Sequence, residues 1–250
     1  MRWPWLVAFW LCFGALTPAA AGDLRVAVGA QIPGAGGDRG SLSLFREDLA
    51  REICRRLMVR CEISRVRFET ILPGIAAGEF DLGFGSFLRT PERERQVAFS
   101  RAVWHSSSRL VGRAGQPPDS ELSTLRGRRM VAVAGSQQLA YLQRQEGDRR
   151  LTVLSAGTIG DVFALLQDGQ ADFALLPALG AYSMLVGDFG DAYRYYGSPI
   201  TADGLGGSVH IALPKARDEL RRAVDQALAD MRDDGSYTRL VRRHFPFNLD

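Results

Sequence analysis

The chain has 250 residues, of which 46% are hydrophobic and 24% charged, and its formal net charge is +3 at pH 7. This is globular composition with enough length for one large domain or two modest lobes, which excludes a disulfide-dependent miniprotein. The cations are 30 arginines and one lysine, Lys215, scattered among acidic residues with no block of five like charges, so a mixed solvated surface is favoured over nucleic-acid binding.

The first 21 residues have the parts of a secretory signal peptide. A positive start at Arg2 precedes an uncharged apolar run over 6–16, and small residues lead to a cleavage site after Ala21. An uncleaved membrane anchor is the alternative, but the run is shorter than the roughly 20 residues of a spanning helix, and Pro18 breaks it. We therefore expect an exported mature chain.

Two cysteines remain in this expected mature chain, Cys54 in a helical stretch and Cys61 at the start of the following strand. Export brings them into an oxidising compartment, in which such thiols pair. A metal site is the competing interpretation, but two thiols without a nearby histidine are too few ligands. We expect a disulfide that ties a helix to its own sheet, and neither a metal nor another cofactor.

Patterns typical of strands and helices alternate along the chain. Apolar residues at a spacing of four mark one face of a first helix. Gly78 occupies the place of a left-handed C-cap, and Thr90 occupies that of an N-cap. The elements expected are strands at 24–28, 61–66 and 81–85, a Gly-rich loop at 34–40, helices at 42–57 and 70–77, and a helix that begins after Thr90.

The second part follows a Gly-, Pro- and Ser-rich surface segment at 112–123. The unit at 71–82, which is an apolar helix, a glycine, two residues, an aspartate and an apolar strand, recurs at 162–173. Alternation predicts parallel sheets covered by helices, and the recurrence favours two similar lobes, although this is also a common α/β connection. The further elements are expected at 125–133, 136–145, 151–154, 209–213 and 217–232, with a break at 233–236 and a last helix to Arg243.

Enzyme motifs are missing from the sequence. The segment 83–87 is not a nucleophile elbow, no dinucleotide-binding glycine motif follows the first strand, and there is no P-loop. The three histidines, at positions 105, 210 and 244, are far apart and lack metal-ligand spacing. No catalytic residue is therefore predicted.

An anion site is the better-supported chemistry. Small residues end the strand before Ser86, and Thr90 to Arg93 open the next helix, which gathers backbone N–H groups, a hydroxyl and a guanidinium. Arg93 can hold a carboxylate through two parallel hydrogen bonds, which lysine cannot. On spacing alone, an arginine paired to a glutamate on a helix surface is favoured over ligand binding.

Three parts of the chain resemble the polar amino-acid periplasmic solute-binding proteins of ABC importers. The block 48–100 resembles them through Leu72-Pro73 and the segments 78–81, 90–93 and 97–100, the segment 125–136 resembles the opening of their second lobe, and 231–237 resembles their C-terminal helix pair. The spacing Cys54-x6-Cys61 is similar to the disulfide of the lysine/arginine/ornithine and histidine binders. The resemblance covers almost the whole expected mature chain.

This resemblance implies an α/β, two-lobed type II periplasmic-binding fold in which each lobe is a mainly parallel sheet flanked by helices, with two hinge strands. The implied boundaries are a signal peptide at 1–21, lobe 1 at 22–109, lobe 2 at 110–207, and a return to lobe 1 with the C-terminal helices at 208–250. The crossings between lobes would fall near 108–112 and 206–212.

The resemblance also implies the ligand-binding positions. Arg93 matches the arginine that grips the ligand carboxylate, with the Ser86 hydroxyl beside it, and Phe68 falls on an apolar wall. Ser136 lies in the anion loop of the second lobe. Leu88 and Gln137 stand where the family usually has hydroxyl side chains. The candidate ligand-binding residues are Phe68, Gly85, Ser86, Leu88, Arg93, Ser136 and Gln137.

The largest departure from the family is Pro177, at the place of the acid that pairs with the ligand's α-ammonium. Gly29 and Ile32 likewise stand where the family has polar or aromatic side chains that recognise the ligand after the first strand. An unpaired buried ammonium costs several kcal/mol, whereas micromolar affinity totals only about 8 kcal/mol. We therefore expect a small carboxylate-bearing ligand that lacks the free amine, unless an acid elsewhere substitutes.

The function implied is that of a monomeric periplasmic protein that captures an amino acid or related carboxylate by hinge closure and delivers it to an ABC importer. No nucleic-acid partner is expected. Two alternatives stay open. One is an enzyme on the same fold, similar to cyclohexadienyl dehydratases, which needs a general acid or base in the cleft. The other is a ligand sensor that acts with a membrane partner.

Overall fold

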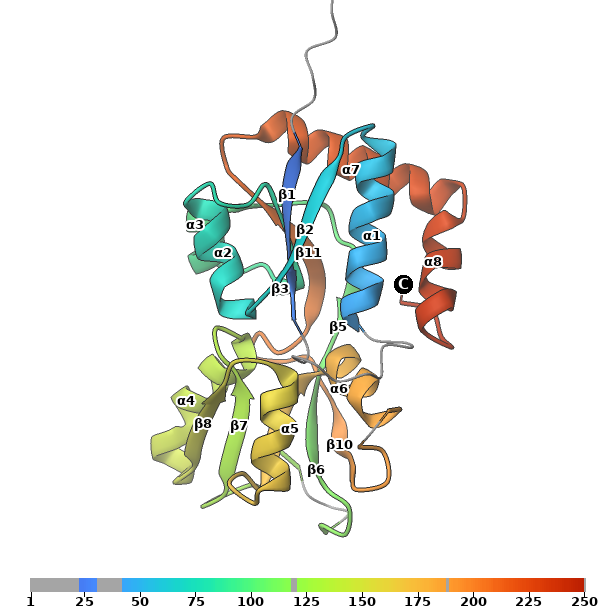
Figure 1. Cartoon of the computed structure of the whole chain (residues 1–250). Helices are drawn as coiled ribbons and strands as arrows, with labels where there is room; N and C mark the ends of the chain where they lie inside the picture. The colour runs from blue at the N-terminus through green and yellow to red at the C-terminus, as the bar shows by residue number, and fades with distance from the viewer. Residues whose placement is uncertain (1–22, 31–41, 118–120, 188, 250) are drawn as a thin grey trace, which may run out of the picture.

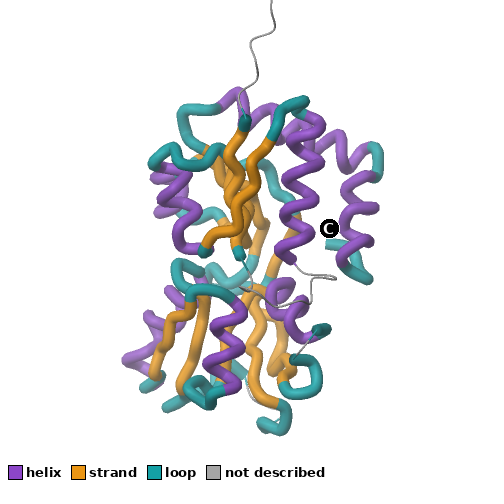
Figure 2. Tube along the Cα trace, in the orientation of Figure 1, coloured by secondary structure: helices purple, strands orange, loops and turns teal. Residues whose placement is uncertain are grey.

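The computed structural model describes residues 23–30, 42–117, 121–187 and 189–249. The predicted signal peptide at 1–21, the Gly-rich loop at 34–40 and Ile32 lie outside the described residues. Figure 1 shows two halves, one above the other, and Figure 2 shows that each half combines strands with helices at their sides. Within the described ranges, no helix has the length and apolar character that crossing a membrane would need.

The upper half in Figure 1 contains the two ends of the described chain. Its strands lie in the order β2-β1-β3-β11-β4, and β5 pairs with β11 at one end. Its N-terminal elements are β1 (Leu24–Gly29), α1 (Leu42–Arg56), β2 (Cys61–Val66), α2 (Phe68–Ala76), β3 (Leu82–Leu88), α3 (Pro91–Gln96), β4 (Ala98–Phe99) and β5 (Trp104–Ser106). Its C-terminal elements are β11 (Gly207–Leu213), α7 (Asp218–Asp233) and α8 (Ser236–His244).

The lower half is a continuous stretch of chain between these two parts. Its strands lie in the order β10-β6-β9-β7-β8. The elements are β6 (Ser108–Arg113), β7 (Arg129–Val133), α4 (Gln137–Arg149), β8 (Thr152–Ala156), α5 (Ile159–Gln167), β9 (Phe173–Pro177), α6 (Ala178–Leu185) and β10 (Tyr193–Ile200).

The chain passes between the halves twice. It leaves the upper sheet at Ser106 and enters the lower sheet at Ser108, and it returns between Ile200 and Gly207. The strands next to the crossings, β6, β10 and β11, pair antiparallel with their neighbours. Parallel pairing joins β1 to β2 and β3, and β7 to β8 and β9. The expectation of mainly parallel sheets therefore holds within β1–β3 and within β7–β9, whereas the strands next to the crossings run in the opposite direction to their neighbours.

The repeated unit predicted at 71–82 and 162–173 is present in both halves. At the end of the first copy, Asp81 accepts a hydrogen bond from the backbone N–H of Arg25 at 2.8 Å. The Arg25 guanidinium also donates to the carbonyl of Gly78, whose φ is 76°. The second copy repeats these contacts with Arg129, Asp172 and Gly169. In each half, an arginine at the start of a strand is thus hydrogen-bonded to the turn that leads into the neighbouring strand.

The predicted disulfide between Cys54 and Cys61 is confirmed. It joins the C-terminal part of α1 to the first residue of β2, so both of its ends lie in the upper half. The predicted caps are also confirmed, because the Thr90 side chain accepts a hydrogen bond from the Arg93 N–H and Gly78 has a left-handed backbone.

Candidate ligand-binding cleft

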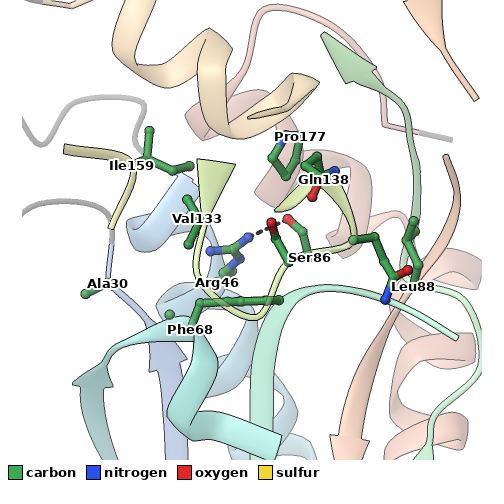
Figure 3. Close-up of a pocket in the computed structure, with 12 residues that line it drawn as sticks. Ala30, Arg46, Phe68, Ser86, Leu88, Val133, Gln138, Ile159 and Pro177 are labelled. Atoms are coloured by element: carbon green, nitrogen blue, oxygen red, sulfur yellow. Dashed lines mark hydrogen bonds between the residues drawn. The ribbon is translucent and has the colours of Figure 1, made fainter. Parts of the chain in front are cut away.

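A cavity of about 40 Å³ lies where the two halves face each other (Figure 3). Its wall combines ends of strands with beginnings of helices, which is where open α/β sheets bind ligands. The upper half contributes Gly29, Ala30, Arg46, Phe68, Ser86 and Leu88. The lower half contributes Val133, Ser136, Gln137, Gln138, Ile159 and Pro177.

Five of the seven predicted ligand-binding residues lie on this wall, and Gly85 and Arg93 do not. Gly85 lies behind Phe68, whose ring stacks on that of Phe87 with centroids 4.8 Å apart. A Cβ at Gly85 would lie 2.8 Å from the Phe68 ring and 2.7 Å from the Phe87 ring. The glycine therefore makes room for the aromatic wall without facing the cavity itself.

Arg93 lies beside the cavity, next to the same two rings, and is 6% exposed. Its Nη1 donates to the Leu88 carbonyl at 2.9 Å, and its Nη2 donates to the Gly135 carbonyl at 3.0 Å. Burial lowers its pKa to about 10, while the charge of Glu92 acts in the opposite direction. Arg93 is thus a cation at neutral pH that contacts both halves, and no described carboxylate lies within 4 Å of it.

Arg46 was not among the residues predicted for the site, yet it lines the cavity. Its Nη2 donates to the Ser86 hydroxyl at 2.7 Å, and Figure 3 shows this bond between the two side chains. Burial lowers the pKa of Arg46 to about 9. A signal existed in the sequence, because position 46 lies four residues after Leu42 and four before Ala50, on the apolar face of the helix.

The wall from the lower half is formed at the start of α4. The Ser136 hydroxyl caps this helix by accepting a hydrogen bond from the Leu139 N–H at 3.1 Å. Gln138, another residue that sequence reasoning missed, donates to the Ser108 hydroxyl at 2.8 Å, and that hydroxyl donates to the Leu205 carbonyl at 2.6 Å. The cavity wall is therefore hydrogen-bonded directly to the first crossing between the halves, at Ser108, and through Ser108 to the second, at Leu205.

The family described as "Bacterial extracellular solute-binding proteins, family 3" matches residues 24–247. The chain belongs to this family.

Named members of family 3 are similar over most of their length. The lysine/arginine/ornithine-binding periplasmic protein of Escherichia coli K12 is 28% identical over 217 residues, which cover 84% of this chain and 82% of that protein. The histidine-binding periplasmic protein of Salmonella typhimurium is 26% identical over 213 residues, with the same coverage. The structure of an ancestral arginine-binding protein bound to arginine superposes with a TM-score of 0.80 at 23% identity, covering 91% of this chain and all of that one. This structural similarity shows that the chain has the two-lobed fold.

The described wall of the cleft carries a positive charge without a negative one. Pro177 lies on the wall, at the last residue of β9 and directly before α6. Proline has neither a charge nor an N–H donor. Among the described residues of the wall there is one arginine and no aspartate or glutamate. The described surface of the cleft is therefore suited to an anion and offers no carboxylate to pair with an ammonium group.

Proposed function

We propose that this family 3 protein works in the periplasm, where it captures a small carboxylate-bearing solute in the cleft and delivers it to an ABC importer of the inner membrane. The solute lacks the free α-amine of an ordinary amino acid. The mature protein starts after Ala21, acts as a monomer and binds its ligand without transforming it.

The observation that carries this proposal is the environment of Arg93. This buried cation donates to one carbonyl from each half, and no described carboxylate lies within ion-pairing distance. A guanidinium can hold a carboxylate through two parallel bonds that are stronger than bonds to neutral carbonyls. A carboxylate that replaces these carbonyl partners would lie between Leu88 of the upper half and Gly135 of the lower half, which is what a ligand needs in order to favour a closed arrangement.

The names of the relatives support a small ligand related to amino acids, and the charges of the cleft narrow this class of ligand. The two named relatives bind lysine, arginine and ornithine, or histidine, according to their names. Such ligands carry an ammonium and a second cationic or basic group, for which the described wall has no acid. Amine-free acids of similar size avoid this mismatch, because burying an unpaired ammonium is costly.

Isothermal titration of the purified mature protein tests the proposal. The panel contains the common L-amino acids and, for each, the matching acid without the amine. We expect saturable micromolar binding of one or more amine-free acids, with the acid recovered unchanged afterwards. Micromolar binding of ordinary amino acids alone would contradict the proposed ligand, and chemical conversion of a bound acid would contradict a pure binding role.

A further inference from the structure

Arg46 is a buried cation that the protein leaves without a countercharge in the described part of the chain. It is 5% exposed, and its Nε has no hydrogen-bond partner there. Its Nη2 bonds the neutral Ser86 hydroxyl, and no described carboxylate lies within 4 Å. Figure 3 shows its guanidinium among the residues that line the cavity, directed at Ser86.

Other arginines of this protein have the partner that Arg46 lacks. Arg129 bonds Asp172 at 2.6 Å, and Arg56, whose side chain is mostly buried, bonds Asp234 at 2.6 Å. A buried charge without a partner is destabilising, so such charges are usually paired or used in a site. Arg46 keeps its charge at neutral pH, because burial lowers its pKa only to about 9. Among the described residues no countercharge faces Arg46 on the cavity side, so a bound anion would supply one.

Arg46 and Arg93 approach the same strand at the cleft, β3. Arg46 bonds the Ser86 side chain, and Arg93 bonds the Leu88 carbonyl. These positions are two residues apart in β3, which corresponds to about 7 Å along a strand. Two guanidinium groups that bond nearby positions of one strand suit a short molecule with an anionic group at each end, and both would repel an ammonium.

We propose that the solute carries two anionic groups and that Arg46 binds the second of them. The class that fits is a short dicarboxylate without an amine, with one carboxylate at Arg93 and the other at Arg46 and Ser86. This inference rests on the proposed function, since it takes the cleft to be the binding site and Arg93 to be its first anion anchor.

Titration calorimetry on the mature protein provides the test. The ligands are succinate and glutarate, their single-carboxylate counterparts butyrate and valerate, and L-glutamate, which adds an ammonium to glutarate. We expect a dicarboxylate to bind at least 100-fold more tightly than its single-carboxylate counterpart, and glutarate more tightly than L-glutamate. Equal or weaker binding of the dicarboxylates would overturn the inference.

Variants assign the preference to Arg46. Arg46→Gln should weaken dicarboxylate binding at least 50-fold and change binding of the single carboxylates less than threefold. Arg60→Gln is the matched control, because the Arg60 side chain is 90% exposed, and it should change neither. If Arg46→Gln weakens the binding of dicarboxylates and of single carboxylates equally, Arg46 does not bind a second anionic group. Should thermal melting show that Arg46→Gln is unfolded, Arg46→Lys and the wild-type ligand comparison still decide the question.

The two proposals fail in different ways. If single carboxylates or amino acids bind in an Arg93-dependent manner, but without a preference for two anionic groups, only the present inference is lost. If no carboxylate binds to the wild type, the proposed function and this inference are both lost.

Discussion

Arg93 and Gly135 are joined across the cleft by a hydrogen bond of 3.0 Å from Nη2 to the carbonyl oxygen. Arg93 belongs to α3 of the upper half, and Gly135 lies between β7 and α4 of the lower half. The same guanidinium holds the Leu88 carbonyl within its own half. A change at this one side chain therefore affects the contact between the halves as well as the proposed anion anchor.

Arg93→Ala should abolish binding of the proposed carboxylate, with a loss of more than about 100-fold, or roughly 2.7 kcal/mol. The free energy of unfolding should change by less than about 2 kcal/mol, because two hydrogen bonds are lost while the desolvation of a buried charge is relieved. Titration calorimetry and urea unfolding measure the two quantities. Arg95→Ala is the control, since Arg95 lies in the same helix with a side chain that is 70% exposed. Unchanged affinity in Arg93→Ala would remove this residue from the site.

Gly85→Ala should disturb the aromatic wall. Its Cβ would lie within 2.8 Å of both the Phe68 and Phe87 rings, and Phe87 is fully buried. Overpacking of this kind costs about 1–3 kcal/mol, and displacement of Phe68 should also weaken ligand binding. Gly147→Ala provides the contrast, because nothing lies within 4 Å of its added Cβ and helix α4 gains propensity. Equal unfolding midpoints for the two variants would show that the rings of Phe68 and Phe87 move aside without a loss of stability.

Pro177→Asp should introduce a partner for an ammonium. The position precedes α6, where aspartate is a favourable N-cap residue. We expect the variant to bind amino acids more tightly relative to their amine-free counterparts, by about tenfold or more. Pro177→Asn has a similar shape without the charge and should leave this ratio near the wild-type value. A ratio that is the same in both variants would mean that position 177 does not face the ligand's amine.

The disulfide should stabilise the protein without affecting the cleft. In the chain-entropy model, a loop this short contributes about 2.5 kcal/mol, so Cys54→Ser/Cys61→Ser should lower the free energy of unfolding by that amount. Cys54 lies eight residues from Arg46, or about 12 Å along α1, so ligand affinity should change less than twofold. Urea unfolding with and without a reductant tests this, since reductant should weaken the wild type and leave the double variant unchanged.

His210 should make stability depend on pH. It is 8% exposed, and burial lowers its pKa below the ordinary value of 6.5, although its bond to the Ser100 carbonyl acts in the opposite direction. Below pH 6.5 the unfolded chain therefore binds more protons than the folded protein, and stability is lost as the pH falls from 6.5 towards the lowered pKa. The loss reaches at most about 1.4 kcal/mol per pH unit.

His210→Gln retains a donor for the Ser100 carbonyl and should remove this component of the pH dependence. The measurement is the free energy of unfolding of both proteins between pH 4.5 and about 8. Parallel curves over this range would show that His210 does not titrate differently in the two states. His105→Gln, at an exposed residue that bonds Ser208, serves as the control.

Most elements could be predicted because local physics decides them. The strand at 61–66 agrees with its predicted bounds, and the Thr90 cap is set by a side chain that bonds a backbone N–H three residues later. The second helix begins at Phe68 instead of Thr70, because its N-cap, Arg67, contributes no side-chain bond that could mark the boundary. The strand predicted at 81–85 extends to Leu88, since its second part pairs with β11, more than 100 residues away.

The site was harder to predict than the fold. Ser86 and Phe68 could be placed by resemblance, but the importance of Arg46 follows from contacts between α1 and β3 that no local pattern records. Gln138 is similar, because its partner Ser108 lies at a crossing between the halves. Such tertiary contacts depend on how the two halves meet, which neither composition nor periodicity specifies.

The position of β11 also determines the order in which the molecule can be completed. This strand lies between β3 and β4, whereas all strands of the lower sheet belong to residues 108–200. As the chain emerges from a ribosome or a translocation channel, N-terminus first, the lower sheet is available in full while the upper one still lacks an internal strand. The upper sheet, whose first strands are synthesised first, is therefore completed last. Until β11 is added, the unpaired edge of β3 can pair with strands of other chains.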